Sequence, residues 1–344
     1  LKRFGLYGTV DLSAERVGPL GAGQLGDLLA HNCTVEGLDL RETILGADGA
    51  KHIARMLLTN TKLKTLDLAS NAIEDQGATA IAHAIRSNTT LRKLELQRNG
   101  ISCEGARHIA DALRVNTTLQ HLGLAFNGFG DMGATHLAEV LAGINTTLQQ
   151  LDLGFNGVCI EGAKALAEGL TKNHWLETLE LGYNGITDVG AMEFARAMKF
   201  NTVLTSLGLP SNNITDDGAS EIAESLRSNH SLIQVGLSSN SIGDPGAKSL
   251  AEVLSCNHHL ETLYLEENDL QENGEAAAAL QAVLLNTFRI KALVPEIQLA
   301  VAMALHPRLG RASWLASLDI NLVQEIVHFC HERIPRDIQY YPRS

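Results

Sequence analysis

Acidic side chains recur at one position of a 28-residue period, with one step of 29, and they are the first candidates for catalysis. This acidic column contains Asp67, Glu95, Asp152 and Glu180. Paired carboxylates are the groups that many hydrolases use as general acid and base. The simpler interpretation is a solvated acidic stripe along one face of the molecule, and the sequence favours it because no other catalytic group accompanies the column.

Histidines and cysteines are the other chemically interesting groups. His52, His108 and His136 share a position on predicted helices. Neighbouring helices pack 8–10 Å apart, so His108 and His136 cannot share a metal ion with ~2 Å ligand bonds. The cluster of His328, Cys330 and His331 has the right ligand types, but no partner pair lies near it in the sequence.

Other signatures of catalysis are also missing. The chain has no phosphate-binding loop, no H-E-x-x-H and no G-x-S-x-G. We therefore expect a protein that is not an enzyme, with no cofactor and no metal.

The composition restricts the class of partner. The chain has 344 residues and a net charge of -12. A nucleic-acid-binding face must be basic, so we expect no nucleic-acid partner. The charge is compatible with a basic protein partner.

The same sequence features bear on where the protein works. No stretch approaches the ~18 apolar residues of a membrane span, so we expect no membrane contact. The five cysteines are odd in number and form no C-x-x-C pair, which favours a reducing, cytoplasmic location. Because the first residue is Leu1 rather than Met, we expect a processed or truncated chain.

A repeated phrase organises most of the chain. The pattern L-x-x-L-x-L-x-x-N recurs eight times, with one extra residue inserted between Asn116 and Asn145. The Asn that ends each phrase is Asn71, Asn99, Asn127, Asn156, Asn184, Asn212, Asn240 or Asn268. The alternating L-x-L segment predicts a short strand, and the Asn should turn inward and satisfy loop backbone groups.

The second half of each unit predicts a helix. A Gly-Ala pair is followed by apolar residues four and eight positions after the Gly, as in Gly77, Ile81 and Ile85. Asp75 and its counterparts stand just before this stripe, where we expect them to cap their own helices. Strands stack ~4.8 Å apart but helices need 8–10 Å, so the array must bend with strands on its concave side.

These residues resemble the ribonuclease-inhibitor class of leucine-rich repeats. The resemblance covers residues 6–286, and it implies an α/β horseshoe solenoid with parallel strands on the concave face and helices on the convex face. Relatives include ribonuclease inhibitors, the sensor regions of NOD-like receptors, Ran GTPase-activating proteins and tropomodulin-like proteins. We therefore divide the chain into a repeat array over 1–286 and a helical C-terminal cap or docking segment over 287–344.

Three functions follow from this resemblance. The first is a protein-interaction module that binds a protein partner on its concave surface. The second is GTPase activation of the Ran-activating type, for which Arg41 and Arg98 project from suitable loops. The third is a substrate receptor of a ubiquitin ligase, because Leu318–Phe329 resembles an F-box or related ligase-docking helix without the expected Pro. The sequence favours the first.

The position just before the Asn suggests where a partner binds. Successive units carry Phe126, Phe155 and Tyr183 there. Neighbouring units should align these rings one strand spacing apart, about 4.8 Å, as one aromatic ridge. Exposed aromatic residues beside charge are typical of interface hot spots. The predicted protein-binding residues are Phe126, Phe155, Tyr183, Glu95, Arg98, Asp152 and Glu180.

Overall fold

The fold is known from a computed structural model that describes residues 8–270 and 337–339. The predicted boundary at residue 286 lies outside these residues. So do the expected docking helix at 318–329 and the cluster around Cys330.

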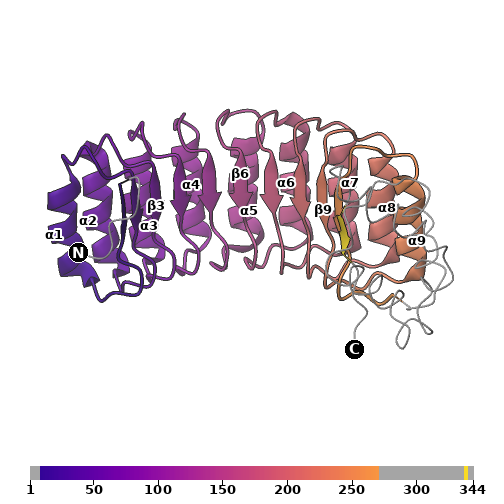
Figure 1. The fold of residues 1–344 in the computed structure, drawn as a ribbon, viewed down its shortest axis with the longest axis horizontal. Coiled ribbons are helices and arrows are strands. Elements are labelled where there is room, and N and C mark those ends of the chain that lie inside the picture. Colours follow the sequence, from indigo (N-terminus) through magenta and orange to yellow (C-terminus); the bar gives the residue numbers. More distant parts are fainter. Residues whose placement is uncertain (1–7, 271–336, 340–344) are drawn as a thin grey trace, which may run out of the picture.

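The strands form one parallel sheet whose order follows the sequence from β1 to β11 (Figure 1). Each strand of the array is three residues long, and neighbouring strands pair at the same repeat position, for example Leu66 with Leu94. The final strand comes from the C-terminal end of the chain and pairs with β10. The strands are β1 Thr9–Asp11, β2 Gly37–Asp39, β3 Thr65–Asp67, β4 Lys93–Glu95, β5 His121–Gly123, β6 Gln150–Asp152, β7 Thr178–Glu180, β8 Ser206–Gly208, β9 Gln234–Gly236, β10 Thr262–Tyr264 and β11 Asp337–Gln339.

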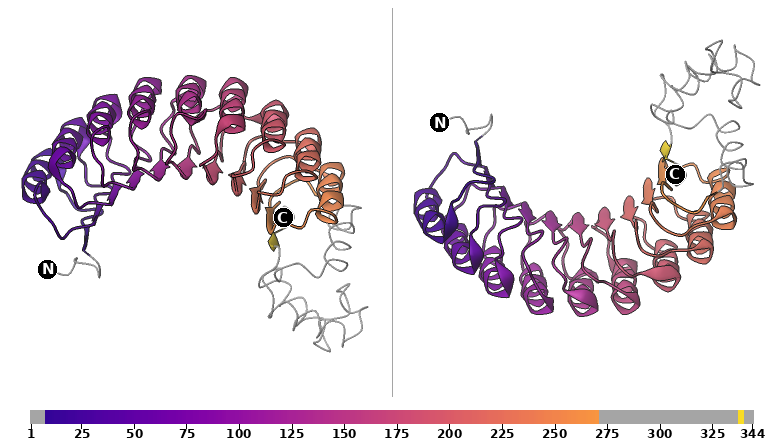
Figure 2. Two further views of the ribbon diagram at one scale, coloured as in Figure 1. Left: turned by 90° about the horizontal axis from the view of Figure 1, so that it is seen from above. Right: turned by 90° about the horizontal axis from the view of Figure 1, so that it is seen from below.

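One helix follows each strand from β1 to β9. Figure 2 shows the helices along the outer side of the arc and the strands along its inner side, which confirms the predicted architecture. The helices are α1 Gly18–Leu29, α2 Gly46–Thr59, α3 Glu74–Ile85, α4 Cys103–Leu113, α5 Gly130–Leu141, α6 Ile160–Lys172, α7 Thr187–Met198, α8 Asp216–Leu226 and α9 Asp244–Leu254.

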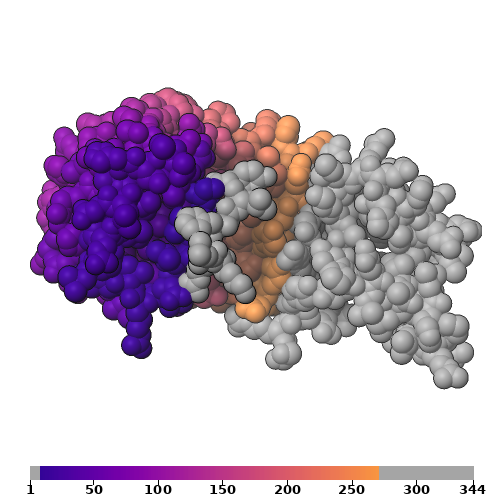
Figure 3. Space-filling view, turned by 60° about the vertical axis from the view of Figure 1, so that its left-hand side comes forward, coloured from indigo at the N-terminus to yellow at the C-terminus, as the bar shows by residue number. Residues whose placement is uncertain are grey.

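The core lies between the sheet and the helices and is built from Leu, Ile, Val and Ala. In one unit, Leu66 and Leu68 of the strand segment and Ile81 and Ile85 of the helix are almost fully buried. The Gly before each helical Ala keeps adjacent helices close, because a Cβ on Gly77 would lie 2.9 Å from the Cβ of Ala50. The units therefore pack directly against one another, as the space-filling view in Figure 3 shows.

The Asn at the end of each phrase joins neighbouring units. The Asn156 amide donates to the carbonyls of Leu124 and Gly154, and its oxygen accepts from the backbone N–H groups of Asn127 and Gly128. This confirms the predicted bonding of the Asn side chains to loop backbone. Asn156 and Asn184 are buried, whereas Asn127 is only half-buried.

The predicted helix caps are wrong in one respect, because Asp75, Asp131, Asp188 and Asp216 cap the next helix rather than their own. The Asp75 carboxylate accepts from the backbone N–H groups of Ser102 and Gly105, which belong to the start of α4. Asp131 does the same for α6, through the N–H groups of Cys159 and Gly162. The carboxylates reach forward along the solenoid because the following helix start lies beside them.

The helix starts therefore fall into two kinds. A helix that follows an Asp-bearing unit has an extended residue at its N-cap, as α4, α6, α8 and α9 do. After units with Ala47, Cys103 or Ile160 in place of Asp, the next helix begins one position earlier, on a residue with positive φ: Glu74, Gly130 or Thr187. A unit with Cys103 or Ile160 in place of Asp therefore lacks the cap of the following helix rather than of its own.

Candidate functional site

The loops after the strands place one residue of each unit in the same unusual conformation. The residue before the Asn has φ of 55° in Arg98, 58° in Phe126, 56° in Phe155 and 57° in Tyr183. The left-handed region costs a residue with a side chain about 1–2 kcal/mol. Each backbone N–H donates to a carbonyl of the next unit, as Phe126 does to Gly154 at 2.8 Å, so the strand ladder continues into the loop. Identical backbone conformation makes the side chains point the same way.

The three aromatic rings form a continuous stack, which we call the aromatic ridge: Phe126, Phe155 and Tyr183. The ring centroids are 3.8 Å apart for Phe126 and Phe155, and 3.9 Å apart for Phe155 and Tyr183. Both pairs are within 15° of parallel. These distances are shorter than the strand spacing of about 4.8 Å that the sequence suggested, because the rings lean onto one another. Burial is partial: Phe155 stays 38% exposed and Tyr183 52% exposed.

The two ends of the ridge differ. At the N-terminal end, the Arg98 guanidinium carbon lies 4.0 Å from the centroid of the Phe126 ring. A guanidinium over a ring face is a cation–π contact worth about 0.5–1 kcal/mol at an exposed site. At the C-terminal end, the same position in the next unit is Ser211, which is too small to cover the ring of Tyr183. Among the described residues, no ring or cation is stacked beyond Tyr183.

Small residues form a low floor between the ridge and the acidic column. Ala125, Gly154 and Gly182 lie one position before the aromatic residues. A Cβ on Gly154 would lie 3.2 Å from the carbonyl oxygen of Gly182, and one on Gly182 would lie 2.8 Å from Pro210 Cγ. The backbone of Gly182 and the side chain of Pro210 approach too closely for larger side chains, so the ridge stays open on its concave side.

Glu95 carries an acidic side chain that the protein already neutralises. It is buried, and its carboxylate pairs with Lys93 Nζ at 2.9 Å and with His121 Nε2 at 2.8 Å. Burial alone would raise the pKa of Glu95, but hydrogen bonds from His121 and Lys93 outweigh it and hold the pKa at about 2. The same contact raises the pKa of His121. This carboxylate is therefore less available to a partner than its sequence position suggests.

Asp152 and Glu180 are different, because no ion pair joins either to a cation within residues 8–270. They lie directly across from each other on β6 and β7. Burial raises the pKa of Asp152, although the N–H of Gly154 donates to its carboxylate at 3.0 Å. Burial, together with the charge of Asp152, raises the pKa of Glu180 to about 7. The pair thus places two carboxyl groups without a cation partner beside the ridge, and Glu180 changes its charge near neutral pH.

Glycines in the next strands make room for the long acidic side chains. The Glu95 carboxylate occupies the space where a side chain at Gly123 would lie, and the Glu180 carboxylate occupies that space at Gly208. Glu180 therefore points along the solenoid toward β8. Tyr183 has its uncovered end on the same side, next to the unit that contains Ser211.

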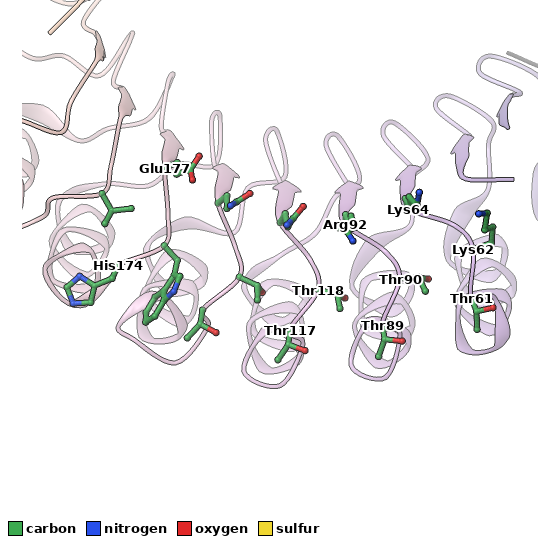
Figure 4. A pocket seen from close by; sticks show the side chains of 16 residues that line it. Thr61, Lys62, Lys64, Thr89, Thr90, Arg92, Thr117, Thr118, His174 and Glu177 are labelled. Atoms are coloured by element: carbon green, nitrogen blue, oxygen red, sulfur yellow. The ribbon is translucent and has the colours of Figure 1, made fainter. Parts of the chain in front are cut away.

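A second depression, which the sequence analysis missed, follows the rim where helices end and strands begin (Figure 4). It has a volume of about 560 Å³ and is lined by threonines that repeat in the N-T-T phrase, including Thr89, Thr117 and Thr146. Lys62 and Lys64 lie at one end, but both already pair with Glu36. The repeated threonines are the sequence feature that could have predicted this groove. The same N-T-T phrase also forms the turns at the Asn residues, in which, for example, the Thr90 N–H donates to Asn88 Oδ1.

The cysteines, the possible metal ligands and the helix lengths restrict the kinds of site that the described residues can form. Their four cysteines are free and exposed. No group of three His, Cys, Asp or Glu side chains in this part of the chain could hold a metal ion. None of its helices is both long and apolar enough to cross a bilayer.

Comparison with known proteins agrees with this architecture. A family model described as "Leucine Rich repeat" matches seven segments: residues 59–82, 87–110, 115–138, 145–167, 172–195, 200–223 and 228–251. The comparison with curated proteins finds no match.

Solved structures similar to the chain include a complex of TLR13 with ssRNA13 and actin-binding site 2 of leiomodin-1. The TLR13 match has 22% identity and a TM-score of 0.47, and covers 75% of this chain and 32% of that chain. The leiomodin-1 match has 20% identity and a TM-score of 0.35, and covers 51% of this chain and 86% of that chain. The chain thus spans about a third of the TLR13 chain.

The ribonuclease-inhibitor class is not distinguished from other classes by these matches. The seven matched repeats, the 28-residue frame and the parallel sheet with outer helices together identify this chain as a leucine-rich-repeat protein.

Proposed function

We propose that this chain is a non-catalytic interaction module that binds a basic protein partner on its concave surface, at the aromatic ridge. The single observation that carries the proposal is the pairing of exposed rings with the uncompensated carboxylates of Asp152 and Glu180. Aromatic anchors beside polar groups are the composition of binding hot spots. Opposite charge on the partner would steer the encounter and compensate the half-buried carboxylates.

The cost of the arrangement supports a binding role. Phe126, Phe155 and Tyr183 occupy a left-handed position that Gly or Asn would fill with less strain. Stacking recovers about 0.5–1.5 kcal/mol per ring pair, which is no more than the conformational cost. Because Ser70, Ser211 and Ser239 adopt the same conformation without a ring, the loop itself does not require aromatic residues, and we infer that the rings serve contact with a partner.

The alternative functions receive less support. A GTPase-activating protein of the Ran type would need an arginine free to enter another active site. Arg41 is held by Asp39 at 2.7 Å and Asp67 at 3.3 Å, and Arg98 is stacked on Phe126. The ubiquitin-ligase alternative depends on residues 318–329, which lie outside the described part of the chain.

Comparative affinity purification tests the proposal. The full chain, a Tyr183→Asn variant and a Glu180→Gln variant would be used as baits with the same cell extract. Asn tolerates the left-handed conformation, so the first variant removes the ring without straining the loop. A convex control, Met132→Ser, alters an exposed side chain on α5.

We expect the parent and Met132→Ser to capture the same basic protein, and the two ridge variants to lose it by at least tenfold. Capture of the same protein by the parent and both ridge variants would contradict the proposal.

A further inference from the structure

The end of the aromatic ridge at Tyr183 is an incomplete stack. The order along the ridge is Arg98, Phe126, Phe155, Tyr183. A guanidinium covers the first ring, and rings cover one another in the middle. Beyond Tyr183 the next residue in the column is Ser211, so the outer face of the last ring is not covered by the residues described.

The acidic side chain nearest in sequence reaches toward the same place. Glu180 lies three residues before Tyr183, and its carboxylate extends over Gly208 of the next strand. No cation of the described chain pairs with it. The Glu180 carboxylate and the uncovered face of the Tyr183 ring are together complementary to a planar cation, which can pair with the one and stack on the other.

Pro210 lies between Gly208 and Ser211 and packs over Gly182, and the strand positions before it are small. Gly208 and Gly236 present no side chains on β8 and β9, and a Cβ on Gly236 would lie 3.5 Å from the Cα of Gly208. The far side is acidic, since Ser239 Oγ donates to Glu267 at 2.7 Å and Ser238 to Glu266. A partner side chain placed there meets negative charge on two sides and a low glycine floor beneath.

We propose that this corner, formed by Tyr183, Glu180 and Gly208, is a subsite for one arginine side chain of the partner protein. The inference rests on the proposed function and names the chemistry of the partner at one point. The guanidinium stacks on the outer face of Tyr183, as Arg98 stacks on Phe126, and donates hydrogen bonds to the Glu180 carboxylate. Planarity and several donors suit arginine to both contacts, whereas lysine offers a single point charge.

Binding at this corner depends on pH. The Glu180 carboxyl has a pKa of about 7 in the free protein and must be ionised to pair with arginine. The titratable group that acts on Glu180 is Asp152 on β6, and Glu95 and His121 act in turn on Asp152. Affinity should therefore rise between pH 6 and pH 8, because Glu180 ionises over this interval.

The test uses the full chain labelled with 3-fluorotyrosine and followed by fluorine NMR. The chain has five tyrosines, and the spectrum of a Tyr183→Phe variant assigns the Tyr183 signal by its loss. The probe is N-acetyl-arginine methylamide, with the citrulline and lysine analogues as matched controls. Citrulline has nearly the shape of arginine but no charge.

We expect the arginine probe to shift the Tyr183 signal saturably, with at least fivefold weaker binding of both analogues. Glu180→Gln should weaken arginine binding at least fivefold, while Asp67→Asn, in the same acidic column, should leave it unchanged. Equal binding of citrulline or lysine, or unchanged binding by Glu180→Gln, would overturn the subsite.

The result separates the subsite from the proposed function. A captured partner that depends on Tyr183, with no arginine-specific shift, overturns the subsite and leaves the function standing. Arginine binding with a captured partner that tolerates Tyr183→Asn overturns the function instead.

Discussion

At the scale of single residues, the same position in the repeat serves opposite purposes in different units. Glu95 is neutralised by Lys93 and His121, Gly123 has no side chain, and Asp152 and Glu180 have no cation partner among the described residues, so that burial raises the pKa of both. Stability alone favours the first two solutions, because a half-buried unpaired carboxylate is costly. We interpret the unpaired carboxylates as the price of a binding surface.

Glu180→Gln should reveal that cost as a pH-dependent gain in stability. The folded-state pKa of about 7 lies above the ordinary value of 4.5, so the folded protein holds the proton more tightly than the unfolded chain. Stability of the parent therefore falls as pH rises from about 4.5 to 7 and is level above that. We expect the free energy of unfolding of the variant to exceed that of the parent by about 1–2 kcal/mol at pH 8, with no such gain at pH 4.5.

Urea denaturation at the two pH values measures this difference. A gain of equal size at pH 4.5 and pH 8 would show that the carboxyl does not titrate as described.

The Asn column makes a second residue-scale prediction. Asn156→Ala removes four side-chain hydrogen bonds to loop backbone and leaves buried groups unmatched. We expect a loss of about 3 kcal/mol, since each buried unmatched group costs about 1–3 kcal/mol. Asn213→Gly is the control, because Asn213 is exposed. Equal melting temperatures for the two variants would refute the stabilising role of the Asn column.

At the scale of elements, neighbouring units are coupled through their helix starts. Asp131 sits in the first turn of α5, yet its carboxylate accepts hydrogen bonds from the start of α6. The helix of one unit is thus stabilised by a side chain of the preceding unit, in addition to the core that the two units share.

We expect Asp131→Ala to destabilise the protein by about 1 kcal/mol, as the loss of an N-cap acceptor does. Hydrogen exchange should become faster at the start of α6, over residues 159–163, and stay unchanged at the start of α5. The control is Asp217→Ala, which alters an exposed Asp in the first turn of α8. Faster exchange confined to α5 would restore the original prediction that Asp caps its own helix.

The sequence predicts features that depend on the pattern within one unit, and it does not predict those that depend on contacts between units. The 28-residue period determined the strands, the helices and the burial of Leu66, Ile81 and Asn156, because these depend on alternation within one unit. The target of Asp131 and the pairing of Glu95 with His121 depend on side-chain directions between units. The closeness of the rings was missed for a similar reason: strand spacing limits backbones, whereas the rings are free to lean.

At the scale of the whole molecule, the arc aligns the equivalent strand positions of successive units on a single continuous inner surface (Figure 2). The net charge of -12 adds a long-range attraction for a basic partner, while the ridge supplies the contact. Electrostatic steering weakens with salt, because the Debye length falls from about 8 Å at physiological ionic strength to about 3 Å at 1 M. Association of the partner should therefore slow as salt rises, with a smaller change in its dissociation.

The position of the bound partner on the arc decides between the aromatic ridge and the other surfaces of the molecule. Hydrogen exchange of the complex with the partner captured by affinity purification would map the protected backbone. We predict protection in the loops that carry the ridge, residues 123–127, 152–156 and 180–184, and none on the outer helices α5, α6 and α7. Protection confined to those helices or to the threonine-lined rim, with the ridge loops unchanged, would contradict the account.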